Sequence, residues 1–157
     1  IGSRFRAEFG TSRLDLATAL VSAGRVPQYL PGQSNYSDVR DPATTLFVES
    51  VQASPTGSLF IDAQKGGQFR PSATVTRLAA AIALVRAAGL RSEAEAKAGT
   101  PLAFLDASGI PNELKGYVAV AISTGLLQAD TNFRPQAGLS RAELAHAITV
   151  IETRAVQ

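Results

Sequence analysis

Cysteine is absent from the 157 residues, which excludes disulfides, thiolate metal sites and cysteine nucleophiles. No run of about 20 apolar residues occurs, so no membrane span is predicted. The formal charge is only +2 and the basic residues are scattered, so the sequence does not indicate a nucleic-acid partner. The chain is long enough for one domain with a sizeable core.

Histidine occurs once, which also argues against an enzyme. His146 lies near no evident acid partner and no Gly-x-Ser-x-Gly sequence is present, so Ser-His-Asp chemistry is not indicated. Glu143 and His146 form one Glu-x-x-His pair, whereas a di-metal bundle needs this half-motif twice and two more carboxylates. We therefore expect no catalytic residues, no metal and no cofactor.

Alanine supplies much of the apolar composition, whose share is 45%, while charged residues make up 18%. Alanine-rich segments with few aromatic residues favour packed helices over sheet. The expected fold class is therefore all-α.

An internal repeat organises the chain. The dipeptide Phe-Arg begins at Phe5, Phe69 and Phe133, at a constant interval of 64 residues (69 − 5 and 133 − 69). Eight residues after each Phe comes an arginine that follows a hydroxyl residue, and these arginines are Arg13, Arg77 and Arg141. Such a register without gaps predicts a triplicated unit.

Each hydroxyl residue is typical of a helix N-cap. Ser12 and Ser140 have an acid three residues later, which predicts a capping box, and Thr76 has the cap alone. Apolar residues then recur at spacings of four and three on one face. We expect helices near residues 13–24, 77–88 and 141–154, with Gly24 and Gly89 as stops.

A second helix precedes Phe-Arg in two copies. The aromatic-x-Asp sequences ending in Asp38 and Asp106 open this element, and Asp41-Pro42 marks one helix start. A short polar helix with a Ser92–Glu95 capping box is expected in the linker between the last two units. The expected division is the second half of repeat 1 at 1–26, repeat 2 at 36–91 and repeat 3 at 102–157.

This ordered pattern of an aromatic-x-Asp opening, a helix, Phe-Arg-Pro and a second helix opened by Thr/Ser-Arg resembles S-layer homology (SLH) repeats. Phe133-Arg134-Pro135 followed by Ser140-Arg141-Ala142-Glu143 resembles them most closely. The resemblance implies one SLH-like module over 1–157, with three helix-loop-helix units around an approximate threefold axis and an incomplete first unit. It also implies an extracellular, envelope-attached part at the C-terminal end of a larger secreted bacterial protein.

The resemblance also implies a ligand, an anionic cell-wall polysaccharide or a polymer linked to peptidoglycan, held in grooves between repeats. The ligand-binding role falls on Arg77, Arg141 and Arg13, with Asp38 and Asp106 lining the same grooves. An arginine beside free helical amides also suits a carboxylate ligand on physical grounds. The alternative is a structural or oligomerisation domain of a secreted hydrolase such as a protease. An upstream enzyme domain and a homo-oligomer are left open as partners.

The missing first half of repeat 1 leads to one more expectation. Leu16, Leu20 and Ala23 should form an apolar face that lacks its partner helix. We expect upstream residues or another chain to cover it.

Overall fold

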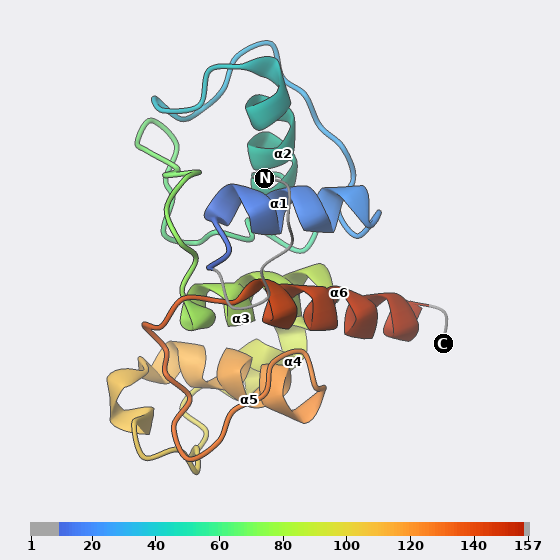
Figure 1. Cartoon of the computed structure of the whole chain (residues 1–157). Coiled ribbons are helices and arrows are strands. Elements are labelled where there is room, and N and C mark those ends of the chain that lie inside the picture. Colours follow the sequence, from blue (N-terminus) through green and yellow to red (C-terminus); the bar gives the residue numbers. More distant parts are fainter. Residues whose placement is uncertain (1–9, 156–157) are drawn as a thin grey trace, which may run out of the picture.

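The computed structural model describes residues 10–155 and is helical, which confirms the predicted all-α class (Figure 1). No β-strand occurs among these residues, which form only isolated β-bridges. None of the helices in this range is long and apolar enough to cross a membrane. The elements are α1 (Arg13–Ser22), α2 (Pro42–Gln52), α3 (Arg77–Ala87), α4 (Arg91–Ala96), the 3-10 turns Ala107–Gly109 and Asn112–Leu114, α5 (Lys115–Ser123) and α6 (Arg141–Ala155).

The predicted caps fix where the principal helices begin. The Ser12 and Asp15 pair and the Ser140 and Glu143 pair each exchange the two hydrogen bonds of a capping box. Thr76 accepts from the Ala79 amide, which caps α3. The expected stops lie just after α1 and α3, where Gly24 and Gly89 have φ values of 74° and 78° that glycine adopts without strain.

Three segments meet in a closed ring of backbone hydrogen bonds. Thr11 N–H donates to Leu139 O at 2.8 Å, Leu139 N–H to Val75 O at 2.9 Å, and Val75 N–H to Thr11 O at 2.9 Å. These positions are 64 residues apart, at the register of the sequence repeat. Such a ring is what a pseudo-threefold axis would produce, and the repeat boundaries themselves stay a prediction.

The first helices of the second and third units, α2 and α5, each pack on a helix of the preceding unit. Helix α2 packs against α1, and α5 packs against α3 (Figure 1). Leu16 and Leu20 of α1 are therefore fully buried within their own chain. The expectation that α1 lacks a partner is wrong, because the first helix of one unit covers the second helix of the preceding unit. Among residues 10–155, no helix covers α6 in this way.

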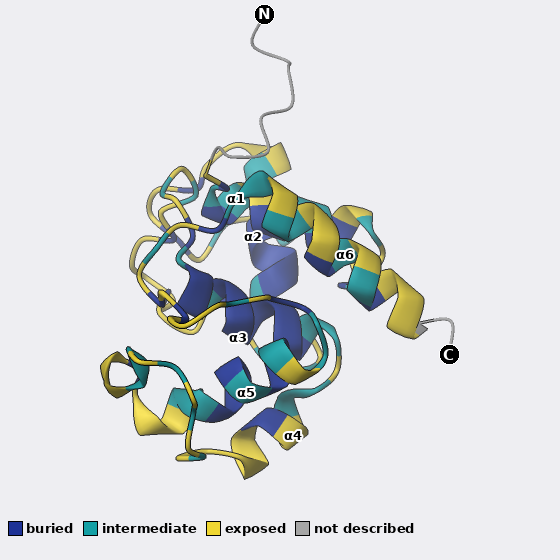
Figure 2. Cartoon of the chain, turned by 60° about the horizontal axis from the view of Figure 1, so that its bottom comes forward, coloured by how far each residue is buried: buried dark blue, intermediate teal, exposed yellow. Residues whose placement is uncertain are grey.

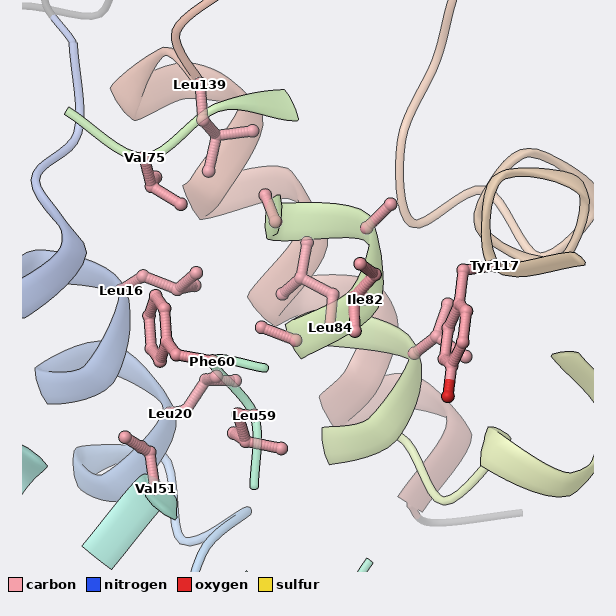
Figure 3. Close-up of a cluster of buried hydrophobic side chains, with 14 of the residues drawn as sticks. Leu16, Leu20, Val51, Leu59, Phe60, Val75, Ile82, Leu84, Tyr117 and Leu139 are labelled. Carbon is pink, nitrogen blue, oxygen red and sulfur yellow. The ribbon is translucent and has the colours of Figure 1, made fainter. Parts of the chain in front are cut away.

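The hydrophobic core lies between α1, α3 and the turns that precede each Phe-Arg dipeptide. Phe60 packs beside Leu16 and Leu20, and Val75 lies beside Leu139 in the ring (Figure 3). Phe69 and Phe133 are fully buried, as expected for anchors of their turns, whereas Phe5 lies outside the described residues. Buried residues run along most of α3, while α6 buries Ala147 and Ile151 and is otherwise half-buried or exposed (Figure 2).

Helix α4 begins without the expected capping box. Its N-cap is Leu90, which makes no side-chain cap, and Glu95 instead accepts hydrogen bonds from Arg91 and from the Tyr117 hydroxyl. Helix α4 packs closely on α5 at Gly116, where an added Cβ would lie 1.8 Å from the Ala94 carbonyl oxygen. The capping-box prediction fails because Glu95 is used to hold α4 against α5.

Candidate functional site

Two tight turns at the Phe-Arg dipeptides build the site. Arg70 and Arg134 both have a φ of 61°, the left-handed region that non-glycine residues rarely adopt. Asp38 accepts from the amides of Phe69 and Arg70 at 2.9 and 2.8 Å and so holds the first turn. Asp106 holds the second turn through the equivalent amides at the same distances. The two aspartates therefore act on the backbone of the turns.

The titration of these aspartates reflects the same contacts. Burial by itself raises the pKa of Asp106, but the hydrogen bonds from the Phe133 and Arg134 amides outweigh it, and the pKa lies below its ordinary value. The pKa of Asp38 is lowered by the same balance of burial and backbone hydrogen bonds. The hydrogen bonds from the turn amides therefore favour the ionised form of both carboxylates.

The first Phe-Arg turn packs around Arg13. Its Nε donates to Phe69 O at 2.8 Å, and its two Nη atoms donate to the carboxylate of Asp62 at 3.1 and 3.0 Å. Arg70 donates to the same carboxylate at 2.9 Å. The Arg13 guanidinium lies 4.7 Å from the centre of the Phe60 ring, and its side chain is only 3% exposed. Asp62 thus forms ion pairs with both Arg13 and Arg70 from within the chain.

The second Phe-Arg turn packs around Arg77 in the same way, but a different acid pairs with the arginine. Arg77 Nε donates to Phe133 O at 2.8 Å, and Nη2 donates to Gln128 O at 2.7 Å. Its other Nη atom pairs with Glu143 of α6. Burial lowers the pKa of the fully buried Arg77, and the charge of Arg134 lowers it further.

The change of acid follows from the sequence. The residue that corresponds to Glu143 in α3 is Ala79 (143 − 64), which cannot pair with Arg13, so Asp62 does so instead. Asp130 is the counterpart of Asp62, because each lies 24 residues after its turn-capping aspartate (62 − 38 and 130 − 106). Among residues 10–155, neither Asp130 nor Arg134 takes part in an ion pair.

The expected geometry of the arginines is therefore corrected. Arg13 and Arg77 turn inward and use their nitrogens on the protein, where the sequence had suggested that each projects outward to a ligand. Asp38 and Asp106 bond to backbone amides and do not line an open groove as acids. Arg141 is half-buried and lines a separate hollow between α1 and α6.

An open groove of about 650 Å³ does lie beside Arg77, and its exposed cation is Arg134. The groove runs between the turn after α5 and the first turns of α6. Its polar lining includes Arg134, His146, Gln128, Asp130 and Glu143. His146 Nε2 lies 2.9 Å from Gly125 O, which fixes the ring at the rim. An anionic group entering here would meet the guanidinium of Arg134 and the imidazole of His146, and also the carboxylate of Asp130.

Sequence reasoning missed Arg134 and His146. Arg134 was visible as part of the repeated Phe-Arg dipeptide, which served only to mark the register. The signal that could have found it is the difference between the equivalent positions 79 and 143, which hold Ala79 and Glu143. Glu143 pairs with Arg77, whereas Arg13 has no such acid and pairs with Asp62, which also binds Arg70. His146 follows Glu143 by three residues and so faces the same groove.

A larger hollow of about 770 Å³ lies under the loop around Leu30–Asn35 and carries less chemistry. Arg40 is the charged side chain in its lining, and its Nε is bound to Ser37 O at 3.2 Å. The nearby buried carboxylate of Glu49 is satisfied by Ser34 and Asn35. These contacts brace the loop.

The fold and its turns define a helical repeat module with a groove beside an exposed arginine. Residues 103–145 match the model of the S-layer homology domain, so the chain carries a domain of this family. No curated protein matches the chain. S-layer homology domains are non-catalytic anchoring modules that attach proteins to the cell surface by binding cell-wall polymers, which places this chain at the cell envelope, outside the cell.

Proposed function

We propose that this chain anchors its protein to the envelope by binding an anionic cell-wall polysaccharide in the groove beside Arg134. The observation that carries the proposal is the contrast between two equivalent arginines. Arg70 is held by Asp62 at 2.9 Å, whereas Arg134 lines an open groove with no ion pair among residues 10–155. A carboxylate on the polymer would pair with Arg134 as Asp62 pairs with Arg70 in the first turn.

The chemistry of the groove favours a carboxylate or phosphate on a sugar. The Arg134 guanidinium offers two parallel donors, and the imidazole of His146 lines the same groove. The backbone of Arg134 is fixed by Asp106 at 2.8 Å, so only the side chain of Arg134 has to be ordered when a ligand binds. Glu143 is already paired with Arg77, which limits its repulsion of an anion.

The direct test is retention of the purified chain on isolated wall polysaccharide over a salt series. A charge-assisted hydrogen bond contributes about 1.5–3 kcal/mol, so Arg134→Ala should weaken retention about tenfold or more. The matched control is Arg70→Ala, which removes the same side chain from the equivalent turn but should leave retention unchanged. Retention should also fall as salt rises, because the contact is exposed to solvent.

The outcomes separate the site from the function. Equal retention of wild type and Arg134→Ala would show that the polymer binds elsewhere. Equal loss in Arg70→Ala and Arg134→Ala would show that turn integrity matters and not the groove. No retention of the wild type on wall material would favour the structural or oligomerisation alternative.

A further inference from the structure

The hollow under the loop between α1 and α2, which we call the loop hollow, is a second candidate binding site. Its volume is about 770 Å³, and none of its lining residues belongs to the Arg134 groove. Figure 1 shows the loop, drawn in light blue, at the edge of the molecule opposite α4 and α5. A ligand in the loop hollow would therefore leave the Arg134 groove accessible.

Two buried side chains of α2 hold the wall of the loop hollow in place. The carboxylate of Glu49, which is 2% exposed, accepts hydrogen bonds from Ser34 Oγ at 3.0 Å and from the Asn35 amide at 2.8 Å. Ser50 Oγ accepts from the Tyr29 amide at 2.7 Å and donates to the Tyr29 carbonyl at 3.2 Å. The wall is thus fixed by the protein itself, so little backbone freedom has to be lost when a small molecule binds.

The side chains that line the loop hollow offer hydrogen bonds without an acid. The polar ones carry amide, hydroxyl and guanidinium groups and are Gln33, Ser34, Asn35, Ser37, Arg40 and Thr45. Apolar carbon comes from Leu30, Tyr36 and Pro42. None of the described residues in this lining is an aspartate or a glutamate. The combination suits a sugar ring, whose hydroxyls need donors and acceptors and whose C–H faces pack on apolar side chains.

One hydroxyl in this lining has no partner in the described part of the protein. Thr45 lies near the start of α2, is 5% exposed and lines the loop hollow. Its amide donates to Asp41 O at 2.9 Å, but its hydroxyl makes no hydrogen bond within residues 10–155. The neighbouring hydroxyl of Thr44, by contrast, donates to the Asp41 carboxylate at 2.9 Å. Because buried hydroxyl groups are almost always hydrogen-bonded, the Thr45 hydroxyl is a group that a ligand in the hollow can satisfy.

The charge in the loop hollow lies at its rim. Arg40 is exposed, and its Nε donates to Ser37 O at 3.2 Å. An ion pair with an exposed arginine contributes little, because water already solvates the guanidinium. The groups that are shielded from water, such as the Thr45 hydroxyl, are uncharged. The loop hollow is therefore built to recognise hydroxyl groups and not an anion.

We propose that the loop hollow binds an uncharged saccharide in the size range of a mono- or disaccharide. The hydroxyl of Thr45 and the amide of Gln33 bond to the sugar hydroxyls, and Leu30 packs on a face of the ring. The recognised chemistry is the pyranose ring, which the amino-sugar glycan of peptidoglycan and the neutral units of a wall polysaccharide both supply. The inference does not rest on anion binding at Arg134, because the two sites share no residue.

Titration of the isotope-labelled chain with uncharged sugars, followed by NMR, tests the proposal. The probes are chitobiose, the disaccharide of N-acetylglucosamine, and cellobiose, the disaccharide of glucose. We expect saturable shifts of amides within residues 30–37 and at Thr45, and an affinity that salt leaves unchanged because the ligand carries no charge. Saturation by chitobiose alone would assign the site to a peptidoglycan-type glycan, and saturation by both sugars would assign it to the pyranose ring itself.

A matched pair of variants tests the role of the unpartnered hydroxyl. Thr45→Val removes this hydroxyl and keeps the branched shape, so binding should weaken about fivefold, the loss expected for one neutral hydrogen bond, at an unchanged Tm. Thr44→Val is the same change one residue away, outside the lining, and should leave sugar binding unchanged. Arg134→Ala should also leave it unchanged, so that failure of the anion site and failure of the loop hollow are distinguishable.

Three results would overturn the proposal. The first is that neither sugar gives saturable shifts in the loop hollow. The second is that Thr45→Val and Thr44→Val bind the sugars equally well. The third is saturable binding of glucuronate without binding of either uncharged sugar, because Arg40 would then be the group that recognises the ligand.

Discussion

Replacing Arg77 with alanine should lower the free energy of unfolding more than replacing Arg134 in the open groove does. The Arg77 side chain is fully buried and joins three segments, because it bonds to the carbonyls of Phe133 and Gln128 and to the carboxylate of Glu143 on α6. Its guanidinium also lies 5.0 Å from the centre of the Phe133 ring. Alanine would leave two carbonyls without this donor and a carboxylate without its counter-charge.

The expected loss can be bounded from these contacts. Removing one partner of a buried ion pair typically costs about 3–5 kcal/mol, because the remaining charge is left uncompensated. The side chain of Glu143 is 27% exposed, so water can partly solvate it and the lower end applies to the ionic part. The carbonyl of Phe133 belongs to a fully buried residue and adds to the loss. We therefore expect the free energy of unfolding to fall by about 3–4 kcal/mol.

Guanidinium unfolding followed by circular dichroism at 222 nm measures this loss, with the slope of the transition as a check that only stability has changed. Arg134→Ala is the control, since an exposed side chain without an ion pair among residues 10–155 should change stability by less than about 0.5 kcal/mol. An Arg77→Ala chain as stable as the wild type, but defective in polymer retention, would refute the structural role. It would restore Arg77 as a direct ligand contact.

Three further outcomes follow from the contacts described above. Lowering the pH should destabilise the fold through Asp38 and Asp106, whose folded-state pKa values are lowered. Their contribution to stability is present above the ordinary aspartate pKa of 3.8 and is lost as the pH falls through the lower folded-state value. The Tm of Asp38→Asn and of Asp106→Asn should therefore depend less on pH in this range. Gly116→Ala should lower the Tm by several degrees, because the added Cβ meets the Ala94 carbonyl at 1.8 Å and forces α4 and α5 apart, whereas Gly109→Ala, with open space around its Cβ, should leave it nearly unchanged. His146→Ala should weaken polymer retention, because the imidazole lines the groove beside Arg134, and a retention assay on wall polysaccharide measures the loss.

Much of the fold was predictable because its determinants are local. Caps such as Ser12 and Thr76 and the stops at Gly24 and Gly89 act within one turn of a helix, so spacing along the chain reveals them. The pairing of helices was not predictable in this way. Helix α2 covers α1 across the repeat register, and only the three-dimensional path of the chain decides which unit provides a cover.

The candidate site was predicted in its region but not in its residues. The arginines at the helix starts suggested an anion site, since a cation at that end gains nothing from the helix dipole. In the structure, Arg13 and Arg77 donate to the carbonyls of Phe69 and Phe133, 56 positions further along the chain. Each also pairs with a distant acid, Asp62 for Arg13 and Glu143 of α6 for Arg77. Spacing could not distinguish an arginine that binds a ligand from one that binds its own chain.

A difference between two equivalent positions, Ala79 and Glu143, explains why the two Phe-Arg turns differ. Because the neighbouring helix has Ala79, it offers no acid to Arg13. Asp62 pairs with Arg13 instead and also with Arg70, so the outer arginine is bound by the protein's own carboxylate. With Glu143 in the equivalent place, Arg77 is neutralised from α6, and Arg134 keeps its charge for another partner. Both sites share the same arrangement of a Phe-Arg turn, a buried arginine bonded to its carbonyl and an aromatic ring beside the guanidinium. A single acid on the adjacent helix therefore decides whether the outer arginine serves the fold or faces an open groove.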